Sequence, residues 1–191
     1  MKKVGILGGT FNPPHNGHLI IANEVYDALG LDEIRFMPNA TPPHKEKVGD
    51  ANTNHRLEMV RLAIDEVPYF KLETIEIERG GTSYSYDTMR ELTSNNPDLE
   101  FTFIIGGDSI DSLNTWYRID DLIKIVKFAG VGRPGFSGET DLPVVKVEIP
   151  LIDLSSTVIR QRLAKGKTVK FLIPEKVEHY IREECLYGTD R

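Results

Sequence analysis

The chain has 191 residues, of which 40% are hydrophobic and 27% charged, and its formal net charge is -6. This length and composition fit one globular domain that needs no disulfide or metal to stabilise it, and they exclude a disordered chain. The acidic balance argues against a nucleic-acid backbone as the main partner, because such binding depends on clustered Lys and Arg, so any phosphate site has to be local.

The first predicted element is a short apolar run at residues 3–7 that stops at Gly8. Such a run predicts a strand buried on both faces, as in a parallel sheet. A loop rich in Gly, Pro and His follows. Residues 17–29 then place apolar side chains at helical spacing, and Gly30 stands where a C-cap glycine is expected.

The same alternation continues along the chain. Further strands are predicted at residues 33–37, 70–77, 100–105, 128–132 and 144–149, and further helices at 55–67, 85–94, 120–127, 157–164 and 174–184. Alternation of this kind indicates an α/β fold with a Rossmann-like, doubly wound parallel sheet. We expect a single domain over residues 1–191, with the helices from about residue 155 to 191 as a small C-terminal extension.

Four loops are of functional interest. Residues 38–54 and 133–142 are polar and rich in Pro or Gly, and loops of that length often bind ligands. In an open parallel sheet, ligands bind beyond the carboxyl ends of the strands, where the strand order reverses. The loops at residues 8–17 and 106–111 lie at those strand ends, so we expect the ligand there.

The strongest functional signal lies in the loop after the first strand, Gly8-Gly9-Thr10-Phe11-Asn12-Pro13-Pro14-His15-Asn16-Gly17-His18. Glycine lets backbone amides approach an anion, and the N-terminus of the following helix favours negative charge. The loop lacks the Gly-Lys-Ser/Thr ending of a Walker loop and the three glycines of the dinucleotide fingerprint. It therefore predicts a phosphate cradle of a different kind.

Two histidines, His15 and His18, are spaced so that both rings can face one side of the first turn if the helix starts near Asn16. They could then act together on one ligand. A surface histidine in a capping loop is the plainer interpretation of either residue alone. A third interpretation is that the two histidines bind a metal ion. Two histidines alone leave a zinc ion without its other protein ligands, however, and the nearby glycines favour phosphate.

The loop resembles the signature of the nucleotidyltransferase superfamily, Gly-Gly-Thr-Phe-Asp-Pro-Pro-His-x-Gly-His, whose two histidines contact the phosphates of ATP. Residues 152–160 are similar to a second signature, Ile-Ser-Ser-Thr-x-Ile-Arg, a helix N-terminus that grips the triphosphate. The resemblance implies catalytic roles for His15, His18 and Arg160. Asn12 stands where the family most often has Asp, which keeps the turn but argues against a metal-ligand role at this position.

The resemblance narrows to the bacterial nicotinate-nucleotide adenylyltransferases and covers nearly the whole chain. The supporting segments are Phe36-Met37-Pro38-Asn39, Pro42-Pro43-His44-Lys45, Gly80-Gly81-Thr82-Ser83-Tyr84-Ser85-Tyr86-Asp87-Thr88, Gly106-Gly107-Asp108, Trp116-Tyr117 and Gly132-Arg133-Pro134-Gly135. The implied ATP-binding residues are Gly8, Gly9, Thr10, Phe11, His15, His18, Gly106, Asp108, Arg133, Ser156, Thr157 and Arg160. The implied mononucleotide-binding residues are Lys45, Thr82, Ser83, Tyr84, Asp108 and Trp116.

Taken singly, several of these residues have plainer interpretations. Trp116 would be a core or surface aromatic, and Asp108 a helix cap. Lys45 and Arg133 would be solvated loop charges, and Tyr84 would pack at a strand edge. Only the family pattern favours the functional roles.

The resemblance implies transfer of the adenylyl group of ATP to nicotinic acid mononucleotide. It also implies Mg²⁺ as cofactor, held largely by phosphate and water. A relative that acts on phosphopantetheine, FMN or a cytidylyl acceptor is the nearest alternative, but such relatives are not expected to carry the segment at residues 81–84 with Trp116-Tyr117. A nucleotide sensor without turnover and a DNA-binding regulator are more distant alternatives. The sequence leaves a homodimer open.

The lone cysteine, Cys185, excludes an internal disulfide and a four-cysteine zinc site, and it is typical of a reducing compartment. Residues 1–8 hold too few apolar side chains for a signal-peptide core or a membrane span. We therefore expect a cytoplasmic protein with no membrane partner, and no catalytic role for the thiol.

Overall fold

The computed structural model describes residues 1–40, 51–132, 135, 137–150 and 152–189, and its centre is a parallel sheet. The strands are β1 (Lys2–Gly9), β2 (Glu33–Pro38), β3 (Phe70–Leu72), β4 (Leu99–Gly106), β5 (Lys127–Val131) and β6 (Val144–Val147). Their order is β3-β2-β1-β4-β5-β6, and every neighbouring pair is parallel. The order reverses between β1 and β4, which confirms the predicted doubly wound sheet.

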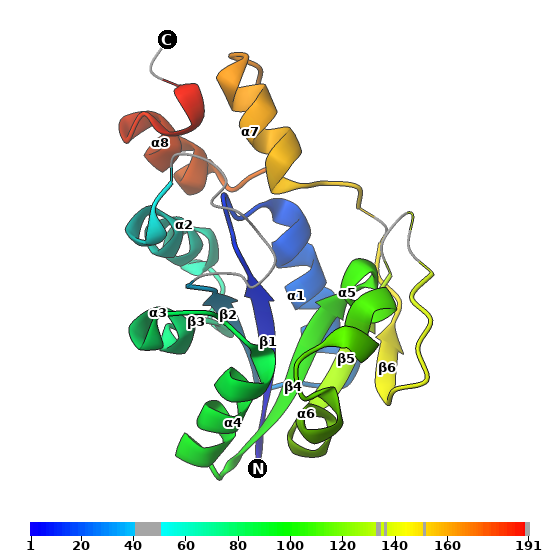
Figure 1. Cartoon of the computed structure of the whole chain (residues 1–191). Helices are drawn as coiled ribbons and strands as arrows, with labels where there is room; N and C mark the ends of the chain where they lie inside the picture. Colours follow the sequence, from blue (N-terminus) through cyan, green and yellow to red (C-terminus); the bar gives the residue numbers. More distant parts are fainter. Residues whose placement is uncertain (41–50, 133–134, 136, 151, 190–191) are drawn as a thin grey trace.

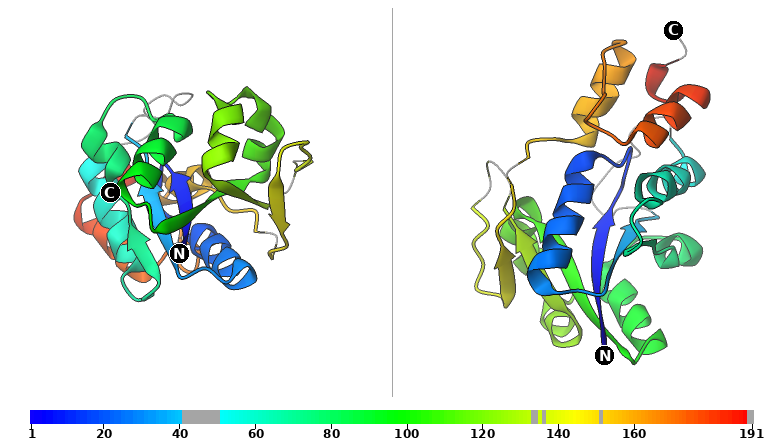
Figure 2. Two further views of the ribbon diagram at one scale, coloured as in Figure 1. Left: turned by 90° about the horizontal axis from the view of Figure 1, so that it is seen from below. Right: turned by 180° about the vertical axis from the view of Figure 1, so that it is seen from behind.

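Helices cover both faces of this sheet (Figures 1 and 2). They are α1 (Asn16–Leu29), α2 (Thr53–Ile64), α3 (Ile75–Arg79), α4 (Ser85–Asn95), α5 (Gly107–Ser112), α6 (Ile119–Ile125), α7 (Ser156–Ala164) and α8 (Glu175–Glu183), with short 3-10 turns η1 (Leu113–Thr115) and η2 (Leu186–Gly188). Helices α7 and α8 lie beyond the end of β1 that is opposite the N-terminus (Figure 1). No helix in the described ranges is long and apolar enough to span a membrane.

The sheet separates two apolar cores. Side chains of β1 alternate between them, with Val4 and Ile6 in one core and Leu7 in the other, as the pleat of a strand requires. The core on the Leu7 side includes residues of α1, α2, α7 and α8, whereas the core on the Val4 side includes residues of α4, α5 and α6. The loop proposed to bind phosphate, residues 10–15, follows β1 and so begins between the two helical layers.

The predicted strand at residues 70–77 is wrong beyond Leu72, because the chain turns there into α3. The amide of Glu73 still donates to the carbonyl of Phe36 at 2.9 Å. The next rung of the parallel ladder would need an N–H from Pro38, which proline lacks. The predicted loop at residues 106–111 is also wrong, since α5 begins at Gly107; other boundaries differ by a few residues.

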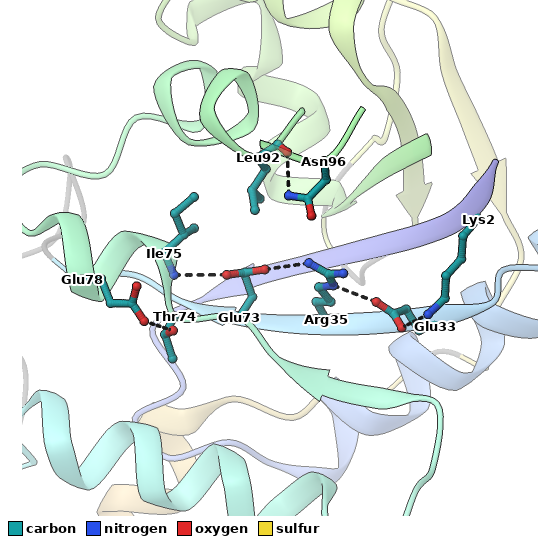
Figure 3. A network of polar contacts seen from close by, with 9 residues as sticks. All are labelled: Lys2, Glu33, Arg35, Glu73, Thr74, Ile75, Glu78, Leu92 and Asn96. Atoms are coloured by element: carbon teal, nitrogen blue, oxygen red, sulfur yellow. Dashed lines mark hydrogen bonds and ion pairs between the residues drawn. The ribbon is translucent and has the colours of Figure 1, made fainter. Parts of the chain in front are cut away.

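A row of charges crosses the β1–β2–β3 side of the sheet (Figure 3). Lys2 and Arg35 both hydrogen-bond the buried Glu33, and Arg35 Nη1 also contacts Glu73 Oε2 at 3.0 Å. Burial alone would raise the pKa of Glu33, but the hydrogen bonds from Lys2 and Arg35 outweigh it and lower the pKa from its ordinary value. Glu73 also accepts from the amide of Ile75 at 3.2 Å, so the row ends where α3 begins.

Candidate active site

The two histidines of the loop after β1 lie together at the start of α1, as the spacing predicts. Their rings stack with centroids 3.6 Å apart and an interplanar angle of 21°. His15 is the N-cap of α1, and its amide donates to Nδ1 of His18 at 3.1 Å. A Cβ at Gly17 would lie 3.0 Å from Nδ1 of His15, so this position favours glycine. The helix N-terminus thus lies together with the buried ring of His15 and the half-buried ring of His18, and a helix start of this kind favours an anion.

The second signature joins the first through hydrogen bonds between α7 and the loop. Ser156 Oγ donates to the carbonyl of Pro13 at 2.8 Å, and Arg160 Nη1 donates to the carbonyl of Asn12 at 2.7 Å. Ser155 caps the helix by accepting from the amide of Val158 at 3.3 Å. The fold therefore brings the two segments, far apart in sequence, to one place and adds a fixed cation to it.

A buried arginine ties the same loop to the end of β2. Arg56 on α2 is 5% exposed; it donates to the carbonyl of Thr10 at 2.9 Å and to that of Asn39 at 2.8 Å. Burial lowers the pKa of Arg56, and the nearby Tyr187 opposes this shift. Arginine nevertheless stays charged in proteins. Its charge adds positive potential beneath the loop.

Two buried polar atoms beside Arg56 have no hydrogen-bond partner among the described residues, Oγ1 of Thr10 and Oδ1 of Asn39. Buried polar groups normally find a partner. Both residues stand at the carboxyl ends of neighbouring strands, where ligands bind in this fold.

Next to the end of β2, the segment between α3 and α4 is held in place by hydrogen bonds. Thr88 Oγ1 donates to the buried Glu76 at 2.8 Å and accepts from Arg79 at 2.7 Å. Ser83 is buried, and its Oγ accepts from the amide of Ala40 at 3.2 Å, which links this segment to the end of β2. Thr82 and Tyr84 are exposed.

An aromatic group follows α5 on this side. Trp116 is half-buried and meets Phe103 and Phe128 edge to face, at centroid distances of 6.0 and 6.5 Å. Tyr117, which is 51% exposed, packs against Tyr84 at 4.9 Å. Trp116 thus has both the core contacts of its plainer interpretation and partial access to solvent.

The loop after β5 is tied to α5 by one carboxylate. Asp111 accepts from Ser137 Oγ and from the amide of Gly138, each at 2.8 Å. These bonds, the one from the Ser137 hydroxyl foremost, lower the pKa of Asp111. Near the start of α5, a Cβ at Gly106 would lie 3.0 Å from Oδ1 of the exposed Asp108, so the glycine permits this close approach.

Two predicted site residues, Lys45 and Arg133, lie outside the described residues. Of the others, the fold assembles His15, His18, Ser156 and Arg160 around the loop after β1. Ser83 and Tyr84 lie between α3 and α4, whereas Asp108 and Trp116 lie in α5 and just after η1.

Sequence reasoning missed Arg56, Tyr187 and Asp111. For Arg56 a signal existed, because it shares one helical face with Met59, Val60 and Ala63, all of which are buried. A cationic side chain on an apolar helix face needs a hydrogen-bond partner in the protein interior, so its position in the sequence predicts a buried polar contact. Tyr187 and Asp111 offered no comparable pattern.

The cytidylyltransferase-like family model matches residues 6–162. The chain is 54% identical to a probable nicotinate-nucleotide adenylyltransferase of Geobacillus thermodenitrificans, over 99% of this chain and 88% of that protein. It is 50% identical to the nicotinate-nucleotide adenylyltransferase of Bacillus subtilis, over 99% of this chain and all of the other. Among solved structures, nicotinic acid mononucleotide adenylyltransferase of Plasmodium falciparum in complex with NaAD superposes with a TM-score of 0.83 at 20% identity, covering 100% of this chain and 99% of that one.

Proposed function

We propose that the catalytic centre lies where α7 meets the loop after β1. The chain belongs to the cytidylyltransferase-like family and, within it, to the nicotinate-nucleotide adenylyltransferases. The enzyme transfers the adenylyl group of ATP to nicotinic acid mononucleotide, giving nicotinic acid adenine dinucleotide and pyrophosphate for NAD biosynthesis. One observation carries the location: Arg160 and Ser156 bond the loop that presents the stacked rings of His15 and His18.

The reaction is an in-line attack by a 5'-phosphate oxygen of the mononucleotide on the α-phosphorus of ATP. The new P–O bond forms as the bond to the pyrophosphate oxygen breaks, and the electron pair leaves with pyrophosphate. A phosphate monoester has its second pKa near 6 and is mostly a dianion at neutral pH. The nucleophile therefore needs no general base, and the site has to supply orientation and positive charge.

Three side chains are proposed to act on the phosphates: Arg160 supplies positive charge, and the rings of His15 and His18 supply N–H donors. Positioning and charge stabilisation dominate this class of reaction, and donors fixed before the reaction are the most effective. Arg160 is fixed through Asn12, and the rings are fixed by the cap of α1. The further ATP contacts that we propose are Gly8, Gly9, Thr10, Phe11, Gly106, Asp108, Arg133, Ser156 and Thr157.

Mg²⁺ is proposed as the cofactor, entering with ATP. Among the described residues no three His, Cys, Asp or Glu side chains gather as a metal site. The donors around the loop are cations and N–H groups, which suit phosphate oxygens, so phosphates and water would hold the ion. When bound, Mg²⁺ neutralises charge on the phosphates.

The mononucleotide is proposed to bind against Lys45, Thr82, Ser83, Tyr84, Asp108 and Trp116. Amides at residues 82–84 would receive the nicotinate carboxylate, and Trp116 would stack on the pyridine ring. The hydrogen bond between Ala40 and Ser83 supports this assignment, since it connects the segment to the strand end next to the phosphate loop.

The test is pyrophosphate release from ATP and Mg²⁺ with nicotinic acid mononucleotide, nicotinamide mononucleotide, FMN and phosphopantetheine supplied separately at equal concentration. Release should be strongest with the first. Preference for another acceptor would overturn the roles of residues 82–84 and Trp116 but keep the phosphate site. Absence of pyrophosphate release with all four would favour a nucleotide sensor.

A cytoplasmic location and a homodimer stay predictions. Sedimentation measurements test whether the protein is a homodimer.

A further inference from the structure

Asn12 belongs to the phosphate loop, yet its side chain is directed into the protein. The residue is 5% exposed, and its Oδ1 accepts a hydrogen bond from the hydroxyl of Tyr187, itself 5% exposed. Tyr187 lies in η2, after the last helix, and the hydrogen bond spans 175 positions of sequence. The C-terminal segment thus reaches the loop that carries the proposed chemistry.

The backbone around Tyr187 is held in an uncommon conformation. Cys185 and Tyr187 have φ values of 52° and 58°, in the left-handed region, which costs a non-glycine residue free energy and persists only where surrounding contacts enforce it. Thr189 Oγ1 donates to the carbonyls of Ile181 and Leu186 at 3.2 and 2.9 Å. The bond to Ile181 fastens the turn to α8, so the position of the tyrosine is fixed by the fold.

Residue 12 is contacted on both its side chain and its main chain. Tyr187 bonds the side-chain oxygen, and Nη1 of Arg160 bonds the carbonyl at 2.7 Å. A shift of Asn12 would therefore move the acceptor that holds the guanidinium. We propose that Tyr187 is a positioning residue, which acts through Asn12 to hold Arg160 where it meets the phosphates of ATP, a role that rests on the adenylyl transfer proposed for this site.

The hydroxyl and the ring of Tyr187 have separable roles. The ring belongs to the apolar core that includes Met59 and residues of α7 and α8, so it supports the fold. The hydroxyl makes the bond to Asn12. Tyr187→Phe removes only the hydroxyl and keeps the ring, which makes it the informative variant.

The experiment measures kcat and the two KM values for wild type, Tyr187→Phe and a matched control, together with thermal unfolding. The control is Tyr69→Phe, because the Tyr69 hydroxyl also donates to an asparagine, Asn23, at 2.7 Å, but at an exposed place away from the loop. Tyr187→Phe should raise the KM for ATP about fivefold, the equivalent of one neutral hydrogen bond, and leave the KM for the mononucleotide unchanged. Tyr69→Phe should change neither.

A double-mutant cycle tests whether the effect passes through Arg160. In an Arg160→Lys background, which loses the guanidinium geometry, removal of the Tyr187 hydroxyl should add little to the KM for ATP. Independent, multiplicative effects would overturn the proposal. So would a rise in both KM values, or an unchanged KM for ATP with only a lower melting temperature, since these indicate a purely structural role.

A second variant keeps the test usable if Tyr187→Phe does not fold. Asn12→Ala deletes the same hydrogen bond from its other end and should raise the KM for ATP to a similar extent. An unchanged KM for ATP in this variant also overturns the proposal. Absence of pyrophosphate release by wild-type protein is a different result, because it contradicts the proposed function and not the positioning role.

Discussion

The proposed phosphate site and the proposed acceptor site are built differently. On the phosphate side, the loop after β1 is held through its main-chain carbonyls by Arg56, which is 5% exposed, and by the half-buried Arg160. On the acceptor side, Tyr84 and Tyr117 are 39% and 51% exposed and contact each other. Buried main-chain contacts leave a loop little freedom, whereas exposed side chains can be replaced at small cost to the fold. The proposed phosphate site is therefore the more rigid of the two, and the proposed acceptor site the more adaptable.

The largest expected effect is on the phosphate side. Arg160→Ala removes a fixed cation and should lower kcat/KM for ATP by about 10² to 10³, the usual loss for one fixed donor to developing charge. Steady-state pyrophosphate release measures it. Arg162→Ala is the matched control, because Arg162 lies on the same helix but its Nε donates to the carbonyl of Thr168 at 2.9 Å. Equal losses of kcat/KM in the two variants would contradict a catalytic role of Arg160.

Arg56 should show that the same side depends on a buried cation for stability. Arg56→Met leaves the carbonyls of Thr10 and Asn39 without their donor, and we expect the free energy of unfolding to fall by about 3 kcal/mol. Urea denaturation measures the change, and Arg56→Lys should restore part of it. Arg61→Met, which removes an exposed partner of Glu58 on the same helix, should have little effect. Equal stability of the two methionine variants would contradict the proposed tether.

The sequence predicts these two sides unequally. Alternating elements and the glycine loop predict the sheet, and two signatures predict which residues meet around the loop. The tether by Tyr187 was not predictable, because the left-handed backbone at Cys185 and Tyr187 follows from tertiary contacts and not from residue type. The end of β3 was missed for a similar reason: its pairing depends on Pro38 of a neighbouring strand. The motifs predict which residues contact the substrates, whereas the contacts that hold those residues in place depend on non-local packing.

On the acceptor side, Trp116→Ala should act on one substrate only. We expect the KM for the mononucleotide to rise about tenfold, as for loss of a stacking contact, with the KM for ATP changed less than twofold. Trp116→Phe should recover part of the affinity. Because Trp116 also packs on Phe103 and Phe128, thermal unfolding must accompany the kinetics. Destabilisation with an unchanged mononucleotide KM would leave Trp116 as a core residue only.

The smallest effect is expected at Asp111, which ties the loop after β5 to α5 in an exposed place. Asp111→Asn keeps the size of the side chain but replaces one acceptor oxygen by a donor and removes the charge. The bonds from Ser137 and Gly138 weaken, and the KM for ATP should rise about threefold. Ser137→Ala deletes the hydroxyl partner alone and should give a smaller rise in the same direction.

The pH dependence of this contact has a definite sign. Its bonds, first that from the Ser137 hydroxyl, lower the pKa of Asp111 below its ordinary value of 3.8. A depressed pKa means that the contact contributes in full above that ordinary value and is lost only as the pH falls through the lower folded value. The ratio of the ATP KM of Asp111→Asn to that of wild type should therefore be constant between about pH 6 and pH 9. A ratio that changes across this range would show that a second titrating group, and not Asp111 alone, ties the loop after β5 to α5.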